Sequence, residues 1–215
     1  MSMDLFDFGD GNGPVPAHRH VMAIKGLPKT VRSDAKGLFL NSAESNDNIV
    51  LGGWVANSAR VAPGVLLGVN AVVFGEAQVE GEVWILNDAR IYGQAQVSEN
   101  AWVSDYAEVY GCAKLCGRVE VKGHATVRGF ARVLDNAYIG GNAVVEDWAV
   151  VGGDAVLRGR VQIGGHVIIG GGVRLEEDEV LEAGIQGNIG FSKLLQSIYA
   201  EEHAKNVAAL DSHIG

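Results

Sequence analysis

The sequence predicts an all-β solenoid, because three features recur with a period of six residues. An aliphatic residue stands at every sixth position from Val55 to Leu181, through 22 consecutive hexads without an insertion. Two positions before almost every one of these anchors stands a small residue, Ala or Val, and Glu179 is the clearest exception. Two positions after most anchors comes Gly, Asn or Asp, which tolerate the left-handed backbone of a sharp corner.

A helix does not accommodate this pattern. An apolar repeat of six matches neither the period of about 3.6 residues of an α-helix nor the period of about 3.5 residues of a coiled coil. In a strand, by contrast, each anchor shares one face with the small residue two positions before it. Self-similarity at a fixed period is typical of solenoids. Each hexad is therefore predicted to be a short strand followed by a corner.

The repeating unit resembles the hexapeptide repeat of left-handed parallel β-helices. It reads aliphatic, x, Gly/Asn/Asp, x, Ala/Val, x. The resemblance implies three strands per coil, a triangular prism and a single-stranded left-handed parallel β-helix of about seven coils, about 35 Å long at the usual strand spacing. The segments GDGNGPVPAHRH and GGWV, followed by the hexads, resemble uncharacterised hexapeptide-repeat proteins of bacteria and their phages, which makes a phage-derived structural protein one expectation.

The chain is predicted to consist of one body with terminal caps. The three predicted parts are an N-terminal cap and loop region (1–54), the β-helix (55–183), and an irregular exit with a C-terminal α-helix (184–215). An open end of a solenoid exposes unpaired strand edges, so each end needs a cover. Trp54 is placed to cover the first coil, Val21–Ile24 is expected to be a short strand, and Lys25–Asp47 is expected to be a loop.

The register of the hexads fails after Leu181. Apolar residues then recur at helical spacing, which predicts a helix over roughly 192–210. We expect Phe191 and Leu195 to contribute to the cover of this end and the helix to pack on a face of the rod or on a neighbouring molecule.

The charge distribution argues against nucleic-acid partners. The net charge is −9, but five acidic residues lie between Glu176 and Glu182, and the remaining acidic and basic residues of 51–183 are nearly balanced. No basic face is predicted. No run of 18 apolar residues and no signal segment is present, so no membrane partner is expected. The two cysteines, Cys112 and Cys116, lack a second pair for a metal site and are expected to be reduced thiols of a cytoplasmic protein.

Outward side chains one coil apart are expected to stack into rows, two of them apolar. One predicted interaction face carries Trp84, Leu86, Trp102 and Tyr138, and another carries Phe74, Tyr92 and Tyr110. Large exposed apolar patches usually mark interfaces. We expect homo-oligomerisation, with a trimer favoured, or docking of a protein partner. The alternative is that the N-terminal loop or the C-terminal helix of the same chain covers these faces.

His18 and His20 form an H-x-H pair that would share one face of a strand. Two ligands do not complete a metal site unless a symmetry mate or an oxygen ligand joins them. The pair is therefore only a weak candidate for metal binding, and the favoured interpretation is a structural cap without metal.

The resemblance also extends to hexapeptide acyltransferases, in which a catalytic His at an intersubunit corner acts beside coenzyme A. The candidates are His124 and His166, whose separation of 42 residues places them on different corners. The hexads contain no inserted loop, although loops usually carry catalytic residues, and the three clustered His ligands of a γ-class carbonic anhydrase are not evident. We predict a non-catalytic scaffold or adaptor without a cofactor. The alternative is an acetyltransferase-like enzyme that uses coenzyme A.

Overall fold

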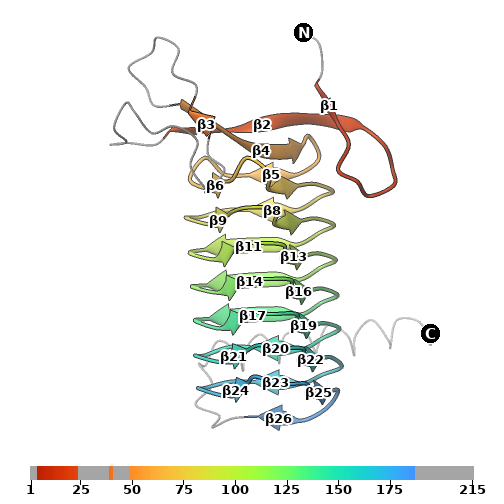
Figure 1. Cartoon of the computed structure of the whole chain (residues 1–215), viewed down its shortest axis with the longest axis vertical. Helices are drawn as coiled ribbons and strands as arrows, with labels where there is room; N and C mark the ends of the chain where they lie inside the picture. Colours follow the sequence, from red (N-terminus) through yellow and green to blue (C-terminus); the bar gives the residue numbers. More distant parts are fainter. Residues whose placement is uncertain (1–3, 24–38, 41–48, 187–215) are drawn as a thin grey trace, which may run out of the picture.

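The structure is a computed structural model that describes residues 4–23, 39–40 and 49–186. Short strands stack into three sheets that run the length of a rod (Figure 1). The first sheet contains, in order, β1 (Leu5–Phe6), β2 (Val15–Ala23), β4 (Ile49–Ala56), β7 (Val72–Val73), β10 (Arg90–Ile91), β13 (Glu108–Val109), β16 (Thr126–Val127), β19 (Val144–Val145), β22 (Gln162–Ile163) and β25 (Val180–Leu181), with β3 (Phe39–Leu40) paired to β4.

The other two sheets contain strands of the rod alone. The second sheet consists of β5 (Arg60–Val61), β8 (Gln78–Val79), β11 (Gln96–Glu99), β14 (Lys114–Gly117), β17 (Arg132–Asp135), β20 (Val150–Val151), β23 (Ile168–Ile169) and β26 (Ile185–Gln186). The third sheet consists of β6 (Leu66–Leu67), β9 (Trp84–Ile85), β12 (Trp102–Val103), β15 (Glu120–Val121), β18 (Tyr138–Ile139), β21 (Val156–Leu157) and β24 (Arg174–Leu175).

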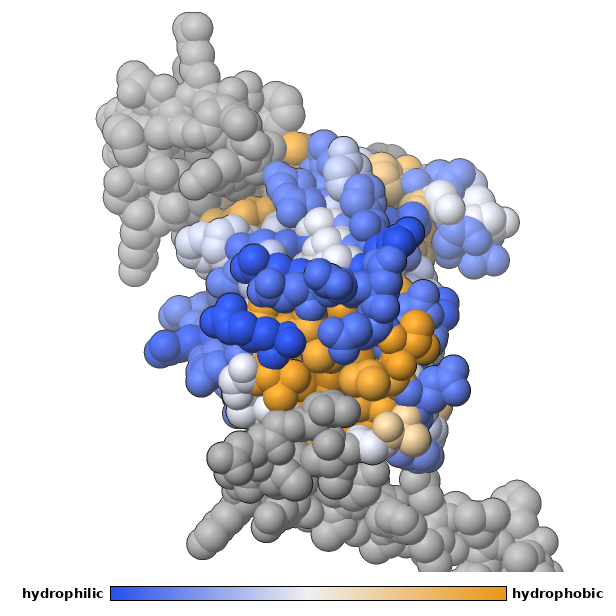
Figure 2. Space-filling model, turned by 60° about the horizontal axis from the view of Figure 1, so that its bottom comes forward, coloured by the Kyte–Doolittle hydropathy of each residue, from blue (hydrophilic) through white to orange (hydrophobic). Residues whose placement is uncertain are grey.

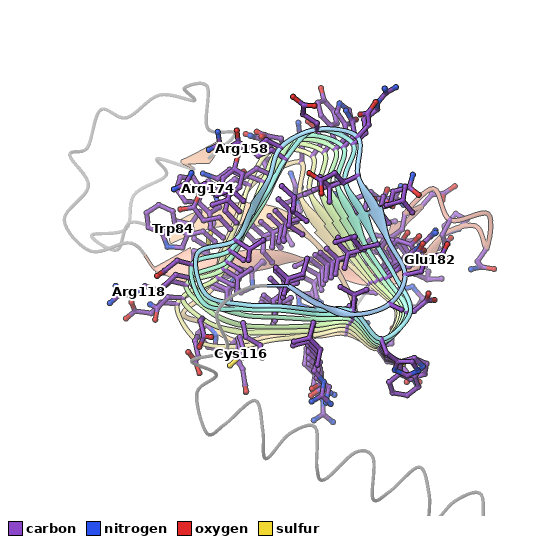
Figure 3. The ribbon with its side chains drawn as sticks, turned by 90° about the horizontal axis from the view of Figure 1, so that it is seen from below. Trp84, Cys116, Arg118, Arg158, Arg174 and Glu182 are labelled. Carbon is purple, nitrogen blue, oxygen red and sulfur yellow. The ribbon has the colours of Figure 1, made fainter. Side chains whose placement is uncertain are left out.

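From β4 to β25, paired strand residues of neighbouring coils lie 18 positions apart along the chain, and β23 and β26 pair at a separation of 17. Ile91 lies beside Val109, for example, and Val109 lies beside Val127, in parallel strands. The chain therefore visits the three sheets in turn and completes about seven coils, as the seven strands of the third sheet show. Viewed along the rod, the coils superpose as a triangle with the anchor side chains inside (Figure 3). The predicted all-β solenoid is confirmed.

The core is the stack of anchors and small residues that the hexads predict. From Leu67 to Ile169 every anchor is buried, and most are fully inaccessible to solvent. The anchors of the last two described hexads, Leu175 and Leu181, are only partly buried because they lie at the end of the rod. Burial of an aliphatic side chain contributes roughly 1.5–3 kcal/mol, so the repeat supplies the main stabilising term along the whole rod.

The corners adopt the left-handed backbone that the sequence predicts. Every sixth residue from Gly75 to Gly171 has a positive φ, and Asn87, Asp105, Asp135 and Asp147 are among them. Aspartates also tie neighbouring coils together, since the Asp147 carboxylate accepts a hydrogen bond from the backbone N–H of Gly165 at 2.9 Å. One corner is unexpected: Glu99 has a φ of 66° although its side chain has no special preference for this conformation.

The N-terminal cap is more regular than the sequence suggests. Val15–Ala23 is one strand, β2, rather than an extended segment followed by a separate short strand at Val21–Ile24. Strand β2 pairs antiparallel with β4, and its register shifts between Arg19 and Val21. Within the predicted loop, Phe39–Leu40 forms strand β3, which also pairs antiparallel with β4. The upper edge of the first sheet is thus hydrogen-bonded by the chain itself, which covers an open strand edge.

The residues described contain no helix, and so none that could cross a membrane. The predicted C-terminal helix over 192–210, with Phe191 and Leu195, lies outside these residues.

Candidate interaction surfaces

A row of large side chains stands on the outer surface of the third sheet. Trp84 pairs in register with Trp102 on the next coil, and Glu120 and then Tyr138 continue the row. The residues point outward because the anchor that follows each of them, such as Ile85, points into the core. The two indole rings lie 5.7 Å apart and are tilted by 59°. The sequence-predicted Trp84, Trp102 and Tyr138 are therefore brought onto one face.

Cationic side chains lie over the rings of this row. The ammonium of Lys122 is 3.9 Å from the ring centre of Trp102, and the guanidinium of Arg158 is 4.8 Å from that of Tyr138. Such contacts are worth about 0.5–1 kcal/mol at exposed sites. The carboxylate of Glu120 holds Lys122 in place through an ion pair of 2.7 Å. The face thus combines aromatic area with positive charge.

Trp84 and Trp102 differ in how well the rod itself accommodates them. Trp84 is 46% exposed, a large value for an indole, whereas Leu86 beside it is buried. Among the described residues, the buried Nε1–H of Trp102 has no hydrogen-bond acceptor. A buried donor without an acceptor costs about 1–3 kcal/mol. Of the two indoles, Trp84 therefore offers the larger exposed area for further contact, because the N–H of Trp102 is already covered by the rod.

A second aromatic row lies on the first sheet. Phe74, Tyr92 and Tyr110 stack nearly parallel with ring centres 4.8 and 4.7 Å apart. A charged residue follows the last ring of the row: Arg128 donates a hydrogen bond to the Tyr110 hydroxyl at 3.1 Å. The Tyr92 hydroxyl donates to Glu108 at 3.0 Å, and burial, together with this carboxylate, raises the pKa of Tyr92 well above its usual value.

The upper part of this second row is covered by the chain's own N-terminal segment. Phe8 stacks on Phe74 at 4.9 Å and Phe6 stacks on Trp54 at 4.7 Å. Arg90 donates a hydrogen bond to the Phe8 carbonyl at 2.7 Å and so holds the segment down. Phe74 is only 5% exposed as a result. At Phe74 the intramolecular alternative applies. Trp54, which is expected to cover the first coil, itself stacks against Phe6.

The lower half of the second sheet is apolar. Leu134 and Val150 are buried, and Cys116 and Ile168 pack against them. Figure 2 shows apolar side chains gathered toward the lower end of the rod, whereas hydrophilic side chains dominate above. These outward side chains contact one another from coil to coil.

The two corner histidines are far from one another in the fold. His124 follows β15 and precedes β16, whereas His166 follows β22 and precedes β23, so they occupy different corners. The imidazole of His124 stacks on Tyr106 at 4.8 Å with an interplanar angle of 3°, and that of His166 lies 6.4 Å from the ring of Trp148. Each imidazole extends an aromatic row, and neither ring has a hydrogen-bonded carboxylate among the described residues that would orient it as a base.

The N-terminal histidines contact different parts of the first coil. Nδ1 of His18 is 3.1 Å from the side-chain oxygen of Asn57, and the buried His20 donates from Nε2 to the carbonyl of Val65 at 3.0 Å. The register shift beside Arg19 separates their environments. Across the described ranges, no three His, Cys, Asp or Glu side chains gather in a manner that could hold a metal ion.

His20 predicts a pH dependence of stability. Burial lowers the pKa of His20 below its ordinary value of 6.5, so the folded protein binds fewer protons than the unfolded chain near that pH. Stability is therefore retained above about pH 6.5 and falls as the pH drops through and below this value. The melting temperature should fall more between pH 8 and pH 5 in the wild type than in His20→Gln, whose amide also donates to Val65. An equal fall in both proteins would contradict this role of His20.

Sequence reasoning missed the aromatic rows at the corners. The rings of Phe130 and Trp148 stack at 4.2 Å, and Tyr106 lies on the other aromatic corner. All three residues stand three positions after an anchor, the same corner position that His124 and His166 occupy. Reading this corner position at intervals of three hexads would have revealed both rows.

Comparison of the chain with models of protein families, with curated proteins and with solved structures found no match. The fold and its outer rows define a parallel β-solenoid that presents aromatic and cationic side chains in register.

Proposed function

We propose that this protein is a non-catalytic scaffold or adaptor, a left-handed β-helix of the hexapeptide-repeat kind that self-associates or docks a protein partner through the third sheet. The observation that carries the proposal is the pair Trp84 and Trp102, whose rings lie 5.7 Å apart on the outer surface of the third sheet and of which the Trp84 indole is 46% exposed. Tryptophan is among the residues that most often dominate binding energy at interfaces.

A solenoid suits this role because its surface is rigid and periodic. The backbone of each coil is hydrogen-bonded to the next, as in the bond from Trp102 N–H to the Val119 carbonyl at 2.8 Å. Binding therefore orders few backbone degrees of freedom, which limits its entropic cost. The resemblance of the hexads to the hexapeptide repeat favours a left-handed coil. The same resemblance makes a trimer the favoured homo-oligomer.

A cytoplasmic location remains part of the proposal. Cys112 and Cys116 are both free thiols, each within hydrogen-bond distance of a side-chain oxygen. Reduced cysteines are usual in cytosolic proteins. The pKa of the Cys116 thiol is raised, chiefly by burial, which lowers its reactivity.

The double variant Trp84→Ala, Trp102→Ala tests the proposal. Removing both indoles should abolish association at concentrations where the wild type associates, because central aromatic residues commonly contribute 2 kcal/mol or more each, roughly thirtyfold in affinity. The particle mass should fall to that of one chain by light scattering, while the circular dichroism spectrum stays unchanged.

Tyr106→Ala is the matched control, since Tyr106 is 58% exposed but lies on a corner. It should leave the mass unchanged. An unaltered mass in the folded double variant would refute the role of the third sheet.

The acyltransferase alternative carries its own test. It requires saturable binding of coenzyme A that weakens in His124→Ala or His166→Ala. Saturable binding with such a dependence would favour the enzyme over the scaffold.

A further inference from the structure

A groove of about 360 Å³ runs along the edge between the first and second sheets. One wall is the corner row that contains Gln94, Cys112, Phe130 and Trp148, and the other wall is the outward row of the second sheet, which contains Gln96 and Lys114. In the view along the rod, this second sheet is the face that carries Cys116 (Figure 3). Neither the tryptophan pair of the third sheet nor the corner histidines line this groove.

The corner wall is an aromatic stack that stops abruptly. Trp148 and Phe130 stack at 4.2 Å with an interplanar angle of only 5°. The next residue of the row is Cys112, one coil above, and its side chain is much smaller than a ring. One face of Phe130 is covered by Trp148, and 47% of the Phe130 surface is exposed. The groove therefore offers an aromatic face on which the stack is unfinished.

The spacing of the coils suits a further ring at this level. Strands in a sheet lie about 4.8 Å apart, and the rings of Phe74, Tyr92 and Tyr110, one coil apart on the first sheet, stack with centres 4.8 and 4.7 Å apart. A planar ring laid on Phe130 would accordingly occupy the level of Cys112. Gln94 bounds this space on the coil above, where its side-chain oxygen lies 3.4 Å from the Cys112 sulfur.

The second wall supplies a positive charge at the same level. Lys114 begins strand β14 two residues after Cys112, on the same coil, and its side chain also lines the groove. Among the residues described, no carboxylate forms an ion pair with Lys114. Gln96 lies beside it in register on the coil above and offers an amide. A ring seated over Phe130 could thus extend a negative substituent to Lys114.

The charge around the groove limits how much negative charge a ligand can carry. Glu76 lines its upper part and is held there by a hydrogen bond of 3.0 Å from Gln94. The chain as a whole carries a net charge of −9. Arg132, in register with Lys114 on the coil below, also lines the groove. A single negative charge on the ligand is enough to pair with Lys114, and the Glu76 carboxylate and the overall field oppose each further negative charge.

We propose that this groove is a binding site for a small planar aromatic monocarboxylate. The ring stacks on Phe130 at the level of Cys112 and continues the row, and the carboxylate lies in the plane of the ring and pairs with Lys114. Gln94 and Gln96 bound the site above. This site is independent of the association surface on the third sheet.

The test is a calorimetric titration of the full chain with indole-3-carboxylate, compared with indole-3-carboxamide and cyclohexanecarboxylate. Saturable binding of the aromatic acid is expected, weakened about fivefold or more by loss of either the charge or the flat ring. Bound acid should also slow alkylation of Cys112 relative to that of Cys116, followed by mass spectrometry. Equal binding of all three compounds, or no saturable binding at millimolar concentration, would overturn the proposal.

Variants assign the site. Cys112→Phe places a ring where the ligand is expected and should abolish binding, and the aromatic residues at the equivalent corners of the next two coils show that this position accepts a ring. Cys112→Ala is the matched control and should retain binding. Lys114→Gln should remove the preference for the acid over the amide, and Phe130→Ala should weaken binding about fivefold or more. Unchanged binding in Cys112→Phe would overturn the placement.

Discussion

Replacing Ile139 by alanine should lower the free energy of unfolding by about 2–5 kcal/mol. Ile139 is fully buried at the centre of the rod and lies in register between Val121 and Leu157 on the adjacent coils. Truncation leaves a cavity that these two side chains cannot fill, because hydrogen bonds on both sides fix the coil spacing. A solenoid is stabilised by contacts between neighbouring repeats, so the loss weakens two interfaces together.

Urea denaturation followed by circular dichroism measures this loss. Val144→Ala is the matched control, since Val144 is an aliphatic residue on the outer surface and only partly buried. It should cost less than about 1 kcal/mol. A loss of similar size in both variants would contradict the assignment of the anchors as the core.

Replacing Gly111 by valine should cost about 2–3 kcal/mol, because Gly111 has a φ of +71° and a β-branched side chain is strained there. A Cβ atom at this position would also lie only 3.0 Å from the backbone nitrogen of Gly129 on the next coil. The strain acts at one corner, but each coil is hydrogen-bonded to the next. The strained corner therefore also destabilises the coils directly above and below it.

Gly111→Asn is the control for this corner. Asn87 and Asp105 already hold equivalent corners with positive φ, and a side-chain hydrogen bond of 2.9 Å joins them. Asparagine should therefore cost much less than valine in the same denaturation experiment. Equal costs for the two variants would show that space, rather than backbone conformation, limits the corner.

The hexads predict most of the rod because every coil repeats one environment. An anchor such as Leu115 lies between two other anchors, Val97 and Val133, one coil away on either side, and each of these has the same kind of surroundings. Local sequence thus determines strand, corner and core together. A residue that departs from the repeat's usual composition is harder to predict. Glu99 has a left-handed backbone that its residue type does not suggest. Its conformation follows from the corner position and not from its own propensity.

Contacts across long sequence separations explain what could not be predicted of the surfaces. The outward positions of Trp84 and Trp102 follow from the alternation of the strand, but the cover of Phe74 by Phe8 depends on the path of the N-terminal segment. The groove depends on one small residue, Cys112, within a row of larger ones. That row becomes visible only when corners three hexads apart are compared.

The particle mass of the wild type by light scattering, measured over a range of concentrations with and without coenzyme A, tests the central claim most directly. The scaffold proposal predicts a multiple of the 22.7 kDa chain mass, with a trimer favoured, that rises with concentration and is indifferent to coenzyme A. A mass of one chain at every concentration, together with saturable binding of coenzyme A, would contradict it.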